Sequence, residues 1–407
     1  MTPTTLADVR AAAALLDGVI EHTPVEHSRA LSELVGTAVH LKCENLQRAG
    51  SFKIRGAYTR LSGLTPEQRA RGVVAASAGN HAQGVALAAR ELGIAAKVFM
   101  PVDAALPKIA ATRDYGAQVE LAGTSVDEAL THALAYAERA GAELIHPFDH
   151  PDVVAGQGTL GLELLDQVPD LATVVVPVGG GGLAAGIVAA LAEARPSVRV
   201  VGVQAASAAA YPASLRAGRP VAARDMRTMA DGIAVGLPGS VPFEILAAHG
   251  TEIVTVSEED LSRALLLVAE RAKLLVEPAG AAAVAALMAE PELFTTGPVV
   301  AVLSGGNIDP LVLMRVVRHG LASAGRFLQL HVRLSDSPGT LAELLRDVAG
   351  TGANVLDISH ARTGVDLGVD EVAIDVQVET KGLEHCAAVH ETLRACGYRV
   401  TSTTRTA

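Results

Sequence analysis

The feature that most constrains the fold is a regular alternation of short, almost wholly apolar runs with longer segments of helical periodicity. Apolar runs of this kind are typical of strands buried on both faces, and helices between them are typical of the crossovers of a parallel sheet. The pattern continues to about residue 320 and predicts an α/β body with helices on both faces of a parallel sheet. The expected strands are Val73–Ala76, Lys97–Met100, Gln118–Leu121, Thr173–Val178, Val198–Val203 and Val299–Leu303, with helices such as His81–Leu92 and Leu183–Ala194 between them.

The pattern changes near residue 320, and we expect a linker at 321–326 followed by a second domain at 327–407. Apolar and polar residues alternate there as they do in half-buried strands, and two segments have helical periodicity. The predicted order βαββαβ indicates an antiparallel sheet with two helices on one face. The expected strands are 328–334, 353–361, 372–378 and 398–403, and the expected helices are 341–348 and 382–396.

Charge and cysteine content exclude several classes of function. The 407 residues carry a net charge of −11, which makes the chain a poor binder of nucleic-acid phosphates. Cys43, Cys386 and Cys396 show no metal-binding spacing, and three scattered thiols suit a reducing compartment. No signal peptide is recognised, and the uncharged stretch at 174–191 is split by Pro177 and by glycines, so we expect a cytoplasmic protein with no membrane or nucleic-acid partner.

The segment GSFKIRGAY at residues 50–58 contains a lysine where a helix is expected to begin. Ser51 is predicted to be the N-cap, which puts Lys53 in the first turn. An ammonium is disfavoured there by the helix macrodipole, so Lys53 is either a surface residue or an amine needed in its neutral, nucleophilic form. One apolar face of this helix would consist of Ile54, Ala57, Tyr58 and Leu61.

Four consecutive glycines and a leucine follow the expected strand at 173–178 and precede a helix. Ligands of open parallel sheets bind at such strand ends, where glycines allow close approach and the helix start offers free amides to an anion. Gly179, Gly181 and Ala184 also fit a dinucleotide motif, but the next strand ends at Gln204 with no acidic residue to hold a ribose. A single phosphate group is therefore favoured over a dinucleotide, and a structural glycine turn stays open.

Two further strands end in polar, glycine-containing turns, at 77–81 and 304–307. Each turn alone would be ordinary. We expect both strands to belong to the same sheet as the strand at 173–178, so that all three ends share one edge and the polar residues surround one site.

Five motifs occur in an order that resembles the fold-type II pyridoxal-phosphate enzymes: SFKIRGA (51–57), SAGNHAQG (77–84), GGGGL (179–183), EPAGA (277–281) and SGGN (304–307). Within that group the chain is similar to the threonine ammonia-lyases. The resemblance implies a two-lobed catalytic domain at 1–320, similar to the tryptophan synthase β fold, with a smaller lobe at roughly 55–150. The second domain, at 327–407, resembles a ferredoxin-like ACT regulatory domain.

The resemblance also implies roles for individual residues. Lys53 would bind the pyridoxal-phosphate aldehyde covalently and act as the base that removes the Cα proton, while Ser304 would face the pyridine nitrogen. Asn80 would bind the pyridine 3-oxygen. Further cofactor contacts would come from Phe52, Gly179, Gly180, Gly181, Gly182, Leu183, Gly232 and Glu277, with the glycines and Leu183 on the phosphate. The loop for the substrate carboxylate would comprise Ser77, Gly79, Asn80 and His81.

The function implied is deamination of L-threonine to 2-oxobutanoate and ammonia, for isoleucine biosynthesis or threonine degradation, with L-serine as a second substrate. Alternatives are a serine ammonia-lyase, a serine racemase, or a catalytically silent amino-acid sensor. Serine racemases of this group carry a metal site after the strand at 198–203, whereas residues 204–210 contain no carboxylate here, so no metal is expected. An effector such as isoleucine or valine would bind the ACT domain at Asp336, Ser337, Gly339 and Asn354, in a homotetramer or homodimer.

Overall fold

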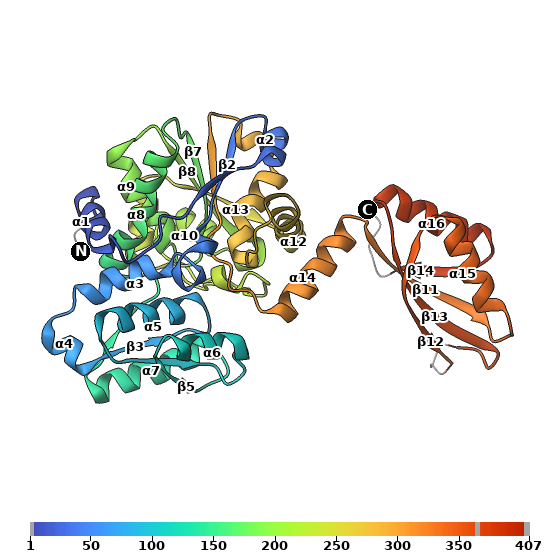
Figure 1. Cartoon of the computed structure of the whole chain (residues 1–407), viewed down its shortest axis with the longest axis horizontal. Helices are drawn as coiled ribbons and strands as arrows, with labels where there is room; N and C mark the ends of the chain where they lie inside the picture. The colour runs from blue at the N-terminus through green and yellow to red at the C-terminus, as the bar shows by residue number, and fades with distance from the viewer. Residues whose placement is uncertain (1–3, 363–366, 403–407) are drawn as a thin grey trace. The chain divides into compact units, whose positions relative to one another are not determined.

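The computed structural model describes residues 4–362 and 367–402, which form two compact units (Figure 1). The first unit ends at Leu313 and the second begins at Met314. This division falls inside helix α14 (Pro310–Ser323), several residues before the boundary expected at 320. The first residues of the expected linker, 321–323, are therefore helical, because the apolar periodicity of α14 continues through them.

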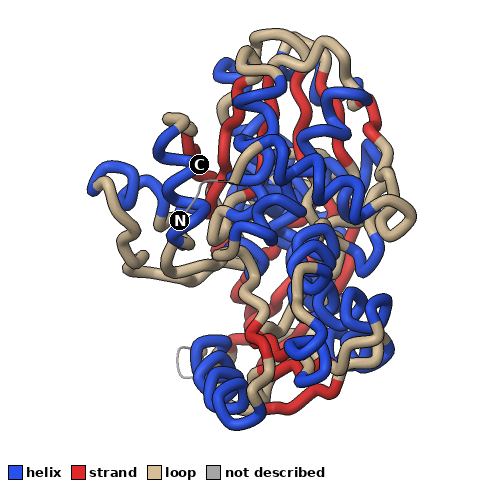
Figure 2. Tube along the Cα trace, turned by 90° about the vertical axis from the view of Figure 1, so that its left-hand side faces the viewer, coloured by secondary structure: helices blue, strands red, loops and turns tan. Residues whose placement is uncertain are grey.

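The larger lobe of the first unit is built on a six-stranded sheet in the order β1-β2-β10-β7-β8-β9. All neighbouring strands are parallel except the edge pair β1 and β2. Every residue of β7 and β10 is buried, as expected for strands covered by helices on both faces (Figure 2). The strands are β1 (Val25–His27), β2 (Val39–Lys42), β7 (Thr173–Pro177), β8 (Arg199–Ala205), β9 (Glu252–Val256) and β10 (Val299–Val302).

The smaller lobe contains a separate parallel sheet in the order β5-β4-β3-β6. The expectation that the strand at 73–76 shares a sheet with those at 173–178 and 299–303 is therefore wrong, since β3 belongs to this second sheet. Apolar periodicity identifies each strand but contains no information on which strands pair. The strands are β3 (Val73–Ala76), β4 (Ala96–Met100), β5 (Gln118–Leu121) and β6 (Glu143–Leu144).

Helices pack on both sheets and against one another, and the contacts α8 with α9 and α3 with α5 are the most extensive helix pairs. Helix α3 also packs on α8, so it joins the helices of the two lobes. The helices of this unit are α1 (Leu6–Leu16), α2 (Arg29–Val35), α3 (Lys53–Ser62), α4 (Pro66–Arg71), α5 (Asn80–Leu92), α6 (Leu106–Asp114), α7 (Val126–Ala140), α8 (Pro151–Gln167), α9 (Gly182–Ala194), α10 (Tyr211–Ala217), α11 (Ser240–Ala248), α12 (Glu258–Leu267) and α13 (Pro278–Ala289).

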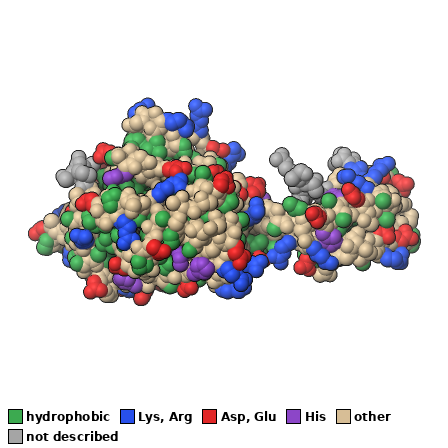
Figure 3. Space-filling model, turned by 90° about the horizontal axis from the view of Figure 1, so that it is seen from above, with side chains coloured by type: hydrophobic (Ala, Val, Ile, Leu, Met, Phe, Trp, Pro, Cys, Tyr) green, Lys and Arg blue, Asp and Glu red, His purple; other side chains and the backbone are tan. Residues whose placement is uncertain are grey.

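The long uncharged stretch at 174–191 is divided between β7, the glycine loop and α9. Among the described residues, the structure contains no helix with the length and apolar character needed to span a bilayer. On the face shown in Figure 3, acidic and basic side chains are interspersed over the surface.

The second unit has the predicted βαββαβ order, with an antiparallel sheet arranged β12-β13-β11-β14. Alternate residues of β11 and β13 are buried under the two helices, and Leu344 and Leu393 of these helices are fully buried. The predicted ferredoxin-like architecture is confirmed. The elements are β11 (Phe327–Ser335), α15 (Thr340–Gly350), β12 (Asn354–Ala361), β13 (Glu371–Glu379), α16 (Leu383–Ala395) and β14 (Arg399–Ser402).

Candidate active site

One cavity of about 550 Å³ in the first unit contains every residue that the sequence assigned to catalysis, cofactor or substrate. Its wall combines strand ends from both sheets, because the β3 end comes from the smaller lobe and the β7 and β10 ends come from the larger one. The three polar turns therefore meet across the two lobes rather than along one sheet edge. The predicted residues in the wall are Phe52, Lys53, Ser77, Gly79, Asn80, His81, Gly179, Gly180, Gly181, Gly182, Leu183, Gly232, Glu277 and Ser304.

Lys53 is the first residue of helix α3, as predicted, but Ser51 is not its N-cap. The N-cap is Phe52, and Ser51 is in extended backbone that forms an antiparallel bridge with Gly305. The Ser51 hydroxyl is buried and has no hydrogen-bond partner in the described part of the chain. Pairing with Gly305 ties the start of α3 to the end of β10, which the capping pattern alone could not reveal.

The amine of Lys53 has few partners. Its Nζ donates to the Pro147 carbonyl at 3.1 Å and lies 5.0 Å from the centre of the Phe52 ring. Burial lowers the pKa of Lys53 to about 8, and the nearby Glu277 opposes this shift. The neutral amine is therefore accessible near neutral pH, which is what a nucleophile or a general base requires.

The glycine loop between β7 and α9 presents backbone amides to the cavity. Gly181 is the N-cap of α9 with φ of 98°, a left-handed conformation that favours glycine. Within the described residues, the amides of 179–183 have no acceptor in the protein, whereas the Gly180 carbonyl is held by the Tyr211 hydroxyl at 3.1 Å and by the Gly239 amide. A Cβ at Gly180 would overlap the Phe148 ring, so a larger residue does not fit. This arrangement is an anion cradle.

The turn after β3 leads into a second helix start, where the amides of Asn80 and His81 have no acceptor in the part of the chain that the structure describes. Asn80 and His81 are the first residues of α5, and its N-cap, Gly79, provides no side chain. The His81 Nε2 donates to the Ile145 carbonyl at 2.8 Å. Burial, with a contribution from Lys53, lowers the pKa of His81 to about 3, so its ring is neutral. An anion at this helix start would therefore be bound by backbone amides, and the neutral His81 ring would add no charge.

Asn80 and Glu277 form a polar pair in the cavity wall. The Asn80 side-chain amide donates to Glu277 Oε1 at 2.6 Å. Burial raises the pKa of Glu277 to about 7, and the charge of Asp231 adds to this effect. Ser304, only 4% exposed, presents a neutral hydroxyl that has no partner in the described residues.

Some cavity residues were missed by sequence reasoning. Lys108 of α6 forms an ion pair with Asp231 at 2.7 Å, joining the two lobes at the cavity wall. His146 and Phe148 follow β6 and pack edge to face. Asp231 directly precedes Gly232, one of the predicted cofactor contacts, so it could have been found, but the other three carry no local signal.

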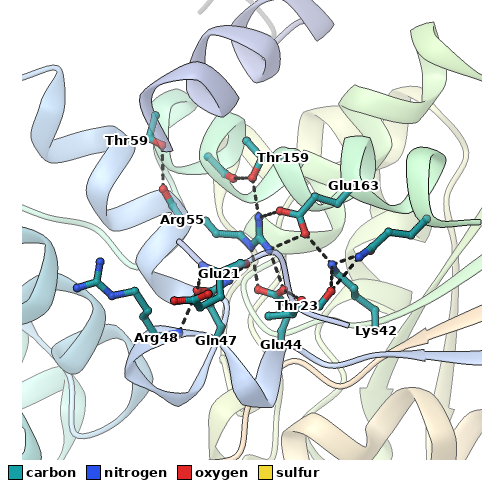
Figure 4. A network of polar contacts seen from close by, with 12 residues as sticks. Glu21, Thr23, Lys42, Glu44, Gln47, Arg48, Arg55, Thr59, Thr159 and Glu163 are labelled. Carbon is teal, nitrogen blue, oxygen red and sulfur yellow. Dashed lines mark hydrogen bonds and ion pairs between the residues drawn. The ribbon is translucent and has the colours of Figure 1, made fainter. Parts of the chain in front are cut away.

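A cluster of buried charges surrounds Arg55 of α3 (Figure 4). Arg55 is fully buried and forms a pair of hydrogen bonds with Glu44, both at 2.8 Å. It also contacts Glu163, which accepts from Lys42 Nζ at 2.6 Å. Two cations thus face two carboxylates in the protein interior, and the cluster fixes α3 to β2 and α8.

A family profile described as pyridoxal-phosphate dependent enzyme matches residues 16–305. This chain belongs to the pyridoxal-phosphate-dependent enzymes. An L-threonine ammonia-lyase of Thermotoga maritima is 46% identical over 97% of this chain and 98% of its own length. The solved structure of a processed threonine deaminase isoform 2 from Solanum lycopersicum has a TM-score of 0.74 at 38% identity, covering 78% of this chain and 95% of its own. Maize serine racemase has the same TM-score at 32% identity, covering 77% and 96%.

The residues of this pyridoxal-phosphate-dependent enzyme fit its cofactor. The amides of the glycine loop suit a phosphate, and the lysine of lowered pKa suits an aldehyde. The neutral hydroxyl of Ser304 can face a ring nitrogen without imposing a charge.

The expected effector residues of the second unit do not form one cluster. Asp336 pairs with Arg362 at 3.1 Å, and its amide donates to the Asp370 carbonyl just before β13. Asn354 instead pairs with Glu379, the last residue of β13. The loop at 336–339 and Asn354 therefore lie at opposite ends of the same strand.

Proposed function

We propose that this enzyme deaminates L-threonine to 2-oxobutanoate and ammonia by eliminating the β-hydroxyl, and that it accepts L-serine as a second substrate. The observation that carries the proposal is the position of Lys53, an amine of lowered pKa in the same cavity as an amide-lined glycine loop. L-threonine ammonia-lyase is also the name of the Thermotoga maritima relative that matches nearly the whole chain.

We assign the cofactor contacts to residues already in the cavity wall. When bound, pyridoxal phosphate supplies an electron sink for the negative charge that develops at the substrate Cα. The amides of 179–183 would hold the phosphate, Asn80 would donate to the 3-oxygen, and Ser304 would face the ring nitrogen, since all of them line the cavity. Because a hydroxyl does not force a positive charge on that nitrogen, we expect prompt loss of the β-hydroxyl to compete well against reprotonation at Cα.

The chain's own groups position the substrate and move its proton. The amides at the start of α5 hold the substrate carboxylate, with Ser77 and Gly79 forming the turn before it. Lys53, once freed, takes the Cα proton as a neutral amine. His81 donates to the Ile145 carbonyl and so orients the turn. Because its ring stays neutral, it adds no charge beside the substrate carboxylate.

Serine racemisation is the second candidate, because maize serine racemase has a similar structure. The segment after β8 speaks against it. Gln204 donates to the Val178 carbonyl at 3.2 Å and accepts from the Tyr211 amide at 2.9 Å, so this position supports the glycine loop. No carboxylate follows at 205–210 to bind a metal.

The direct test incubates the purified protein and pyridoxal phosphate with L-threonine or L-serine. Release of 2-oxobutanoate and ammonia, faster than release of pyruvate from serine, is the expected result. D-serine is quantified in the same samples by chiral chromatography. D-serine as the main product would replace the lyase by a racemase, and no product from either amino acid would favour the silent sensor.

We further propose that the second unit binds isoleucine or valine in a cytoplasmic homotetramer or homodimer, with Asp336, Ser337, Gly339 and Asn354 as effector contacts. The ferredoxin-like architecture of the second unit and the resemblance of its sequence to ACT domains support this proposal. Because the loop and Asn354 lie at opposite ends of β13, a ligand touching both would have to bridge two copies of the unit. Activity of the full chain and of Asp336→Ala, measured with and without isoleucine, tests it: equal sensitivity of the two proteins would remove Asp336 from the site.

A further inference from the structure

Three side chains and one backbone carbonyl form a continuous hydrogen-bonded chain behind the cavity. The Asn307 side-chain nitrogen donates to the Ala49 carbonyl at 2.7 Å and to Asn80 Oδ1 at 2.8 Å. The Asn80 side-chain nitrogen in turn donates to Glu277 Oε1 at 2.6 Å. The chain begins at a backbone carbonyl and ends in the cavity wall.

The direction of every bond in this chain follows from its first member. A backbone carbonyl can only accept, so the Asn307 atom beside Ala49 has to be the nitrogen. The same nitrogen contacts Asn80, which therefore has to present its oxygen to Asn307. The NH₂ group of Asn80 is left for the cavity side, where it meets Glu277.

The starting carbonyl is held in place by the local backbone. Ala49 has φ of 60°, which is uncommon for a residue other than glycine, and Gly50 has φ of 68°. A Cβ at Gly50 would overlap the Asn307 amide, and the Gly306 amide donates to the Gly50 carbonyl at 2.9 Å. The turn at 49–50 and the turn at 305–307 thus lock each other, so Asn307 has little freedom to turn its amide over.

We propose that Asn307 is a positioning residue that sets the polarity of the Asn80 amide, so that Asn80 offers a hydrogen-bond donor, and not an acceptor, to the cofactor 3-oxygen. The inference rests on the proposed role of Asn80. An asparagine free to turn over presents its oxygen and its nitrogen with similar ease, since the two ends have the same size and shape. Only the donor end can bind an anionic oxygen.

Asn307→Asp tests the proposal with a nearly isosteric change. The new carboxylate oxygen repels Asn80 Oδ1, and the Asn80 amide turns over to relieve this, which puts its oxygen towards the cofactor. The dissociation constant of pyridoxal phosphate, measured by titrating the apoprotein, should rise about 10- to 100-fold, the usual effect of losing a hydrogen bond to a charged group. The visible absorption spectrum of the bound cofactor should change in the same way as in Asn80→Ala.

Asn307→Leu is the matched control. It removes the donors without repelling Asn80, so the contact with Glu277 is left to favour the present orientation of the Asn80 amide, and affinity should fall at most about twofold. Both variants leave the Ala49 carbonyl without its donor, so a purely structural role for Asn307 predicts a loss that remains when Asn80 is replaced by alanine.

The Asn80→Ala background separates this effect from simple charge repulsion and from loss of folding. With no amide to turn over, Asn307→Asp should weaken cofactor binding no further there, whereas charge repulsion would cost the same factor in both backgrounds and would overturn the proposal. If the Asn307→Asp chain does not fold, Asn307→Leu provides the test. The proposal then requires an affinity for pyridoxal phosphate that falls about twofold in the wild-type background and does not fall in Asn80→Ala.

The measurements on Asn80→Ala and Asn307→Asp distinguish a wrong role for Asn307 from a wrong role for Asn80. Unchanged cofactor affinity in Asn80→Ala would overturn the role of Asn80, and the positioning role of Asn307 with it, while threonine turnover by the wild-type protein could still stand. Weakened affinity in Asn80→Ala together with an unaffected Asn307→Asp would overturn the positioning role alone.

Discussion

The first unit contains two lysines withdrawn from bulk water, and their surroundings differ sharply. Lys42 lies in the charged cluster, where its Nζ donates to Glu163 at 2.6 Å, to Gln167 at 2.9 Å and to the Thr23 carbonyl at 2.9 Å. Lys53 lines the cavity, and the one acceptor recorded for it among the described residues is the Pro147 carbonyl. An ammonium has three protons to donate, so Lys42 is fully satisfied and Lys53 is not.

Burial disfavours the charged form of both lysines, and the pKa of each is lowered. At Lys42 the attraction of Glu163 and Glu44 opposes this, and with Arg55 the amine belongs to a cluster of two basic and two acidic side chains. At Lys53 only Glu277 opposes it, and Glu277 has a raised pKa itself. The same side chain is thus a structural cation in one region and an available base in the other because of the carboxylates around it.

The largest effect is expected from Lys53→Ala. The variant should release no 2-oxo acid from threonine and should show no covalent attachment of pyridoxal phosphate, while its free energy of unfolding stays within about 1 kcal/mol of wild type because no ion pair is broken. Turnover assays, borohydride trapping of the cofactor and urea unfolding are the measurements. Substantial turnover in this variant would show that the two lysines do not differ in the proposed way.

Arg55→Met should show the reverse pattern, a loss of stability in the charged cluster. Removing this fully buried cation leaves Glu44 without its ion-pair partner, which costs about 3–5 kcal/mol for a buried pair. Arg60, on the same helix α3, pairs with Glu143 nearer the surface, and Arg60→Met should cost about 1 kcal/mol or less. Urea unfolding of both variants provides the test, and equal losses would contradict a special role for the interior cluster.

Glu277→Gln should remove a pH dependence that belongs to the cavity. In the folded apoprotein Glu277 keeps its proton up to about pH 7, whereas in the unfolded chain it titrates near its ordinary value of 4.5. Stability should therefore fall by roughly 3 kcal/mol as the pH rises from about 4.5 to 7. Unfolding of the apoprotein across this range should show a flatter profile for Glu277→Gln, and Asp231→Asn should lower the upper end of the window because Asp231 raises that pKa.

The smallest effect is expected at Phe52. The face of its ring stabilises the ammonium of Lys53, so Phe52→Leu should lower the pKa of that lysine by about half a unit, given the usual strength of such contacts. The pH dependence of reductive methylation at Lys53 in the apoprotein measures it. Phe148→Leu, in the same cavity wall, is the control, and an equal shift there would assign the effect to general burial.

The sequence predicted the strands and helices well because their signals are local. The strands at 73–76 and 118–121 have the predicted bounds, and α5 and α9 each begin one residue before the expected start. The motif residues also meet in one cavity, as the resemblance to pyridoxal-phosphate enzymes implied. Apolar periodicity and glycine-rich turns depend on neighbouring residues alone, so one chain is enough to read them.

The capping of α3 was mispredicted because a partner distant in sequence decided it. Ser51 has the residue type of an N-cap, but pairing with Gly305 holds it in extended backbone. In the same way, β3 joined the second sheet although its sequence resembles that of the other buried strands.

By itself the sequence determined the α/β body, the ferredoxin-like second unit and the set of motif residues that line one cavity. Tertiary structure alone decided which lysine is paired, where Arg55 finds its carboxylates and which end of Asn80 faces the cavity. The physical reason is that charge state and hydrogen-bond direction depend on the groups that burial brings together. Those groups come from segments far apart in the chain, such as Ala49, Asn80 and Asn307.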